Sequence, residues 1–167
     1  MNTKEIARGG LLAAAAVALL YVGGTAISVG PAACLVAGVT SAVPLLKRAR
    51  LKTAVTLYVA VAILSALLVP RKMVVAAYVL FCGLYPIVKF CVECYVPRRR
   101  QMDLKLAYFN IMLVIAAALA IFVFLPQFSL SGFRLLAVWV AANIVFVIYD
   151  VALSRLIALL RKSLPPD

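Results

Sequence analysis

Long apolar runs, separated by short polar segments, are the feature of this sequence that most constrains its fold. Apolar residues make up 67% of the chain and charged residues only 13%, so a solvated globular surface cannot be built. The apolar residues run continuously instead of alternating, which argues against a β-barrel. A transmembrane helix needs about 20 residues of this kind. The sequence therefore predicts an all-α, polytopic membrane protein.

Six apolar runs are expected to form six transmembrane helices in one bundle, and residues 1–167 are expected to form a single transmembrane domain. The predicted spans are about 9–28, 32–46, 53–69, 73–94, 106–125 and 134–159. Span two is short and contains Pro44. Span four contains Gly83 and Pro86, and a bend is expected there because Pro86 has no amide hydrogen for the carbonyl of Cys82.

The distribution of basic residues predicts the orientation of these spans. With the N-terminus inside, 14 of the 17 basic residues fall on the inner face and 3 on the outer face. The three outer residues are Arg71, Lys72 and Arg134. Cytoplasmic loops collect Lys and Arg, so the split predicts six spans with both termini cytoplasmic. The expected location is the bacterial cytoplasmic membrane, crossed several times.

The same composition argues against several classes of function. The net charge of +12 lies between apolar runs and is explained by topology, so no nucleic-acid partner is expected. There is no histidine, and Cys91 and Cys94 form a CxxC without a second ligand pair, so no metal is expected. No cofactor motif and no phosphate-binding glycine loop is present. No catalytic residues are expected, because no candidate nucleophile has a recognisable base or metal partner.

Polar residues within spans are costly and therefore informative. An intramembrane polar cluster is predicted near the inner face, formed by Lys89, Glu93, Asn110 and Asp150. One interpretation is a clasp in which Lys89 of span four pairs with Asp150 of span six. The alternatives are that Lys89 extends to the headgroups, that Asp150 pairs with Arg155, or that the cluster relays protons or ions.

A second group of residues is predicted in the outer half. Its members are Arg71, Lys72, Tyr78, Arg134, Trp139 and Asn143. An aromatic and amide lining under a basic rim suits a small anionic or planar solute. The alternative is an interfacial aromatic belt with loop charges that face lipid headgroups.

Small residues on span one predict a helix-packing interface. Gly10, Ala14 and Ala18 are spaced by four, so they lie on one face where another helix can approach closely. With six short spans and an inside N-terminus, this stripe resembles the substrate-binding S component of energy-coupling-factor transporters. That resemblance implies that Ala14 and Ala18 meet a transmembrane coupling subunit, which works with ATPases, and that a solute binds in the outer half.

Two further stretches, GLYPIVK (83–89) and NIVFVIYD (143–150), look like those of small uncharacterised bacterial six-span membrane proteins. The function expected first is a solute-binding membrane subunit of a bacterial importer. Its partners would be the lipid bilayer, a small-molecule solute, the coupling subunit and the ATPases. The alternative is a non-enzymatic scaffold or assembly subunit, similar in fold to the rod-shape-determining membrane subunit.

Overall fold

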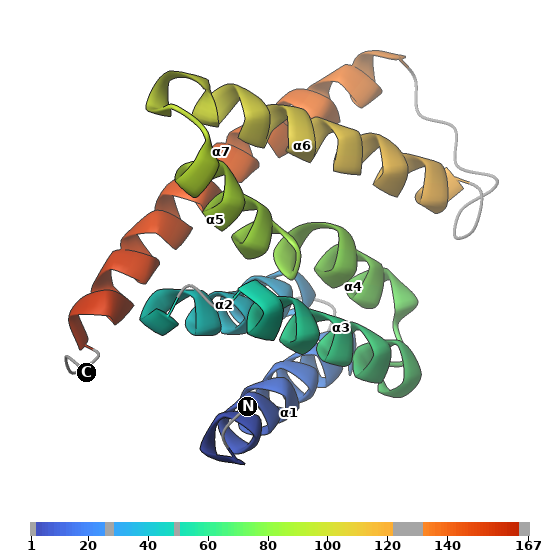
Figure 1. The fold of residues 1–167 in the computed structure, drawn as a ribbon. Helices are drawn as coiled ribbons and strands as arrows, with labels where there is room; N and C mark the ends of the chain where they lie inside the picture. The colour runs from blue at the N-terminus through green and yellow to red at the C-terminus, as the bar shows by residue number, and fades with distance from the viewer. Residues whose placement is uncertain (1–2, 26–28, 49–50, 122–131, 164–167) are drawn as a thin grey trace. The chain divides into compact units, whose positions relative to one another are not determined.

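The computed structural model describes residues 3–25, 29–48, 51–121 and 132–163, and the regular structure within these ranges is entirely helical. The all-α class is thus confirmed. The helices are α1 (Thr3–Thr25), α2 (Gly30–Arg48), α3 (Leu51–Leu68), α4 (Lys72–Ala77), the π-helical turn η1 (Tyr78–Cys82), α5 (Tyr85–Tyr95), α6 (Arg98–Leu119) and α7 (Gly132–Ser163) (Figure 1).

Within these described ranges, five helical stretches are long and apolar enough to cross a membrane. They are Ala7–Thr25, Leu51–Leu68, Lys72–Tyr95, Arg98–Leu119 and Leu136–Leu159. Helix α2 adds a shorter apolar stretch, Gly30–Leu45, at the position of the second predicted span. Residues 26–28 and 122–125, which belong to the predicted first and fifth spans, lie outside the described residues.

The chain divides into two compact units, Met1–Tyr95 and Val96–Asp167. The expectation of one bundle and a single domain stays a prediction. The first unit contains α1 to α5, and the second contains α6 and α7.

The first unit packs through small side chains. Helix α1 lies against α2 and α3, and α2 also contacts η1 and α5. The buried face of α1 consists of Ala13, Ala16, Val17 and Leu20, at the spacing of a single helical stripe. Because lipid tails are as apolar as these side chains, close backbone approach and not hydrophobic burial stabilises such packing.

Gly38 of α2 lies close against the carbonyl group of Cys82. A Cβ atom added to Gly38 would overlap this carbonyl group. The same carbonyl lacks its usual helical donor, because Pro86 has no amide hydrogen. Here Gly38 is required by the contact between helices.

The predicted bend in span four is present as an interruption of the helix. Helix α4 passes into η1, and α5 begins at Tyr85 after Gly83 and Leu84. Pro86 thus lies in the first turn of α5, where its missing amide hydrogen breaks no bond within that helix. The interruption is packed against the core, since Tyr78 and Cys82 are buried with Cys34 and Ala37 of α2.

Large apolar side chains remain exposed on both units. They include Leu11 on α1, Ile63 and Leu67 on α3, Ile111 on α6, and Ile144 and Ile148 on α7. Exposed apolar surface on this scale is costly in water, while in a bilayer it faces hydrocarbon.

Replacing Gly38 by Ala is expected to destabilise the first unit, because the new methyl group would overlap the Cys82 carbonyl. Overpacking of this kind costs about 1–3 kcal/mol. The thermal unfolding temperature of the purified protein in lipid nanodiscs measures the effect. Gly9→Ala is the matched control, since a Cβ there meets nothing within 4 Å. Equal stability of the two variants would contradict the close contact.

Candidate functional site

Three pairs of side chains join α6 to α7 within the second unit, and we call this set the α6–α7 seam. The pairs are Lys105 with Asp150, Phe109 with Phe146, and Asn110 with Asn143. Residue numbers rise along α6 as they fall along α7, so the two helices are antiparallel. A charged, an aromatic and an amide layer follow one another along this contact.

The amide layer is a reciprocal pair. Asn110 Nδ2 donates to Asn143 Oδ1 at 3.0 Å, and Asn143 Nδ2 donates to Asn110 Oδ1 at 3.3 Å. Each amide nitrogen also donates to a carbonyl on its own helix, that of Leu106 at 2.9 Å and that of Trp139 at 3.0 Å. Both donors and the acceptor of each amide are therefore used, as an apolar environment requires.

The aromatic layer separates the amide pair from the charges. The rings of Phe109 and Phe146 are stacked, with centroids 4.3 Å apart and planes inclined by 15°. Both side chains are buried. Interlocked rings resist sliding of one helix along the other, so this layer holds the register that brings the polar pairs together.

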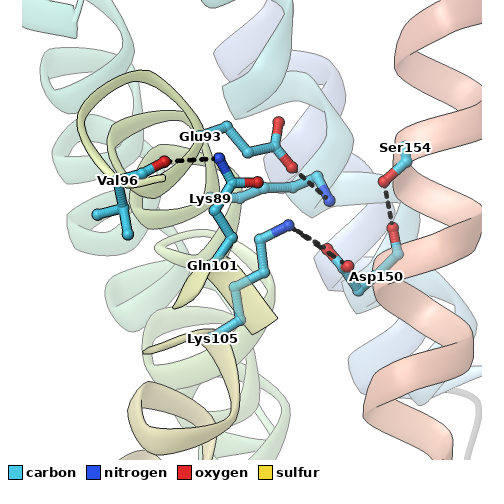
Figure 2. A network of polar contacts seen from close by, with 7 residues as sticks. All are labelled: Lys89, Glu93, Val96, Gln101, Lys105, Asp150 and Ser154. Atoms are coloured by element: carbon cyan, nitrogen blue, oxygen red, sulfur yellow. Dashed lines mark hydrogen bonds and ion pairs between the residues drawn. The ribbon is translucent and has the colours of Figure 1, made fainter. Parts of the chain in front are cut away.

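The charged layer is an ion pair that is nearly excluded from solvent. Lys105 Nζ lies 3.4 Å and 3.5 Å from the two carboxylate oxygens of Asp150 (Figure 2). The exposed fractions of Lys105 and Asp150 are 5% and 7%. Ser154 donates to the backbone carbonyl of Asp150 at 2.8 Å, one turn along α7. Pairing with Lys105 makes the buried carboxylate of Asp150 tolerable.

The other charged members of the predicted polar cluster lie on α5, in the first unit. Lys89 Nζ is 3.2 Å from Glu93 Oε1, one turn further along the helix (Figure 2). Lys89 is 2% exposed and Glu93 is exposed. The predicted clasp between Lys89 and Asp150 concerns residues of different units and stays a prediction.

The structure gives several predicted solute-binding residues a partner within their own unit. Lys72 donates to the carbonyls of Ala66 and Val69 at the end of α3. Tyr78 is fully buried, with its hydroxyl 3.4 Å from that of Ser41. Asn143 belongs to the amide pair described above. Arg71, Arg134 and Trp139 lie at half-buried or exposed positions.

The small-residue stripe on α1 is not used within the first unit. Gly10, Ala14 and Ala18 are exposed, on a face of the helix beside the packed residues Ala13, Ala16 and Val17. Leu11, beside the stripe, has an exposed fraction of 74%. An exposed helical face of small residues can accept another helix at short distance.

Sequence reasoning missed Lys105 and the pairing of the two asparagines. The predicted fifth span starts at residue 106, whereas α6 begins at Arg98, directly after Pro97. Counting depth from residue 106 left Lys105 in a loop and placed Asn110 and Asn143 at different depths. Pro97 was the available signal, since a helix commonly starts just after a proline.

Comparison with protein-family models, with curated proteins and with solved structures finds no match. In the part of the chain that the structure describes, no group of three or more His, Cys, Asp or Glu residues is placed to hold a metal ion. The fold and the seam nevertheless define the class. Five long apolar helices, with polar side chains paired inside them, make this a helical multi-pass membrane protein.

Breaking the Lys105–Asp150 pair on one side only is expected to destabilise the second unit strongly. Lys105→Met or Asp150→Asn leaves its partner buried without this counter-charge, and loss of one partner of a buried pair costs about 3–5 kcal/mol. The double variant is expected to lose less than the two single losses added together. Thermal unfolding in nanodiscs gives the required double-mutant cycle.

Asp103→Asn is the matched control, since this carboxylate is exposed on the same helix. Additive losses from the two single changes would show that Lys105 and Asp150 do not interact. The same cycle with Lys89→Met in place of Lys105→Met tests the predicted clasp.

Proposed function

We propose that the chain crosses the bacterial cytoplasmic membrane six times, with both termini in the cytoplasm. The 14-to-3 division of basic residues supports this topology. The length of α2 supports it too, because its 19 residues extend about 28 Å, close to the roughly 30 Å of a hydrocarbon core. Helix α2 is then the second span and completes the set of six, although its apolar stretch is short.

Cysteine-accessibility labelling tests this topology. Single cysteines at Ser131 and Ser163, in a chain whose native cysteines are alanine, are expected to react with a membrane-impermeant maleimide from opposite sides of the membrane. Intact and opened cells distinguish the two sides. Labelling of both positions from one side would contradict the topology.

We propose that this membrane protein is a subunit without catalysis of its own, which binds a small solute for a bacterial importer. The observation that carries the proposal is the exposed stripe of Gly10, Ala14 and Ala18 on α1. One face of α1 packs into the first unit, and an adjoining exposed face offers small residues to a neighbouring helix. A partner helix, such as one of a coupling subunit, fits this face.

The solute-binding part of the proposal depends on the basic residues of the outer half. Tyr78 and Asn143 are already bonded to Ser41 and Asn110. Recognition of an anionic or planar solute then falls either to Arg71 in the first unit or to Arg134 and Trp139 in the second. An arginine binds carboxylate or phosphate in a bidentate manner, and tryptophan offers a flat apolar face.

A second candidate is a non-enzymatic scaffold or assembly subunit. Tyr78, Lys72 and Asn143 already form hydrogen bonds within their own units. These bonds favour the second candidate, because a scaffold needs surfaces for helix packing but no solute site. The two candidates share the α1 stripe and differ in the partner that it receives.

Association through α1 is expected to fail when bulk is added to the stripe. Ala14→Leu with Ala18→Leu prevents close backbone approach, so the partner should be lost while the chain itself remains folded. Affinity purification from native membranes, followed by mass spectrometry, measures the bound partner. Ala15→Leu is the matched control, since this residue is also exposed on α1 but lies off the stripe.

The identity of the partner separates the two candidates. A membrane coupling subunit recovered with ATPases supports the importer, and a set of envelope-assembly proteins supports the scaffold. Retention of the same partner by the Ala14, Ala18 double variant would show that the stripe is incidental.

A further inference from the structure

The π-helical turn η1 leaves one backbone carbonyl open to two different donors. The amide of Gly83 donates to the carbonyl of Tyr78 at 2.7 Å, five residues back. In an α-helix the same amide would bond to the carbonyl of Val79, four residues back. The Val79 carbonyl instead accepts a hydrogen bond from the Tyr58 hydroxyl of α3 at 3.0 Å.

Tyr58 also covers the glycine at which the register changes. A Cβ atom on Gly83 would lie 2.9 Å from Cδ2 of Tyr58 and 2.7 Å from Cζ of Tyr78. The two tyrosine rings have centroids 6.3 Å apart. The absence of a side chain at residue 83 thus lets the Tyr58 ring approach, and the approach brings its hydroxyl to the Val79 carbonyl.

Two registers of this helix can therefore satisfy the same carbonyl. In the observed register the Tyr58 hydroxyl donates to the Val79 carbonyl, and the Gly83 amide donates to the Tyr78 carbonyl. In an α-helical register the Gly83 amide would donate to the Val79 carbonyl and the Cys82 amide to the Tyr78 carbonyl. The hydrogen bond from the Tyr58 hydroxyl to Val79 would then be lost. Pro86 leaves the Cys82 carbonyl without its usual donor in both registers, so it weakens the helix here without choosing between them.

We propose that α4, η1 and α5 form a two-register switch in which the Tyr58 hydroxyl is the latch. Conversion of the π turn to α-helical bonding, with the same number of residues, rotates α5 by about 100° relative to α4 and shifts it by about 1.5 Å, the step of one residue. Lys89 and Glu93 would turn with α5. The contact of Ile87 with Leu45 and Ala54 opposes this rotation and stabilises the observed register. π-Helical turns of this kind are common at functional sites.

Distances between spin labels in the first unit test the switch. One label is placed on the native Cys94 of α5 and the other on Lys52→Cys of α3, both exposed positions, with the other cysteines replaced by alanine. Pulsed electron–electron double resonance on the full chain in nanodiscs then measures the distance between the labels, which changes when α5 rotates. Tyr58→Phe keeps the ring and removes the latch. The population with a second distance should therefore rise about fivefold relative to the population with the first.

Tyr78→Phe is the matched control, since its hydroxyl bonds to Ser41 and not to Val79. It should leave the distances unchanged. An unchanged distribution in Tyr58→Phe, or an equal change in both variants, would overturn the proposal.

A chain that lacks Leu80 supplies a second test, which does not depend on how well Tyr58→Phe folds. Removing one residue from η1 turns it into ordinary α-helix without rotating α5. The wild-type distance should therefore persist, and it should no longer respond to Tyr58→Phe. A response to Tyr58→Phe in the shortened chain would show that the register of η1 is not what the latch controls.

Discussion

A bilayer offers no water to the backbone, so every amide and carbonyl within it needs a partner from the protein. An unbroken helix meets this demand locally, and the informative places are the helix ends and interruptions. At the end of α3 the ammonium group of Lys72 donates hydrogen bonds to two backbone carbonyls, where the helix no longer supplies amide donors. At η1 the hydroxyl of Tyr58 donates a hydrogen bond to the Val79 carbonyl. Side chains from elsewhere in the chain thus complete the backbone bonding.

The same demand applies to polar side chains, and it accounts for the α6–α7 seam. The two amides of Asn110 and Asn143 use each other and one carbonyl on each helix, which is a closed set of bonds. A slide by one turn would open this set and would also separate Lys105 from Asp150. The seam therefore specifies one register of the hairpin. The contribution is to specificity, since a buried ion pair adds little net stability over apolar packing.

The helices themselves could be predicted from the sequence. Apolar runs of about 20 residues leave few alternatives to helix, and Pro70 and Pro97 lie close to real helix boundaries. The break in span four was also predictable, because Pro86 removes a donor. Its form was not, since the π turn at Tyr78–Cys82 lies against Tyr58 of α3 and Gly38 of α2. Neither contact is local in the sequence.

The sequence alone determined that this chain is helical and belongs in a membrane, because both properties follow from hydropathy and chain chemistry, which are local. Tertiary structure decided which polar groups meet. Depth within a span suggested Lys89 as the partner of Asp150, yet Lys105 lies beside it in the second unit, and Asn110 meets Asn143. The choice depends on how two helices are rotated and shifted against each other. Interlocking side chains such as Phe109 and Phe146 set that rotation and shift, and no single helix contains this information.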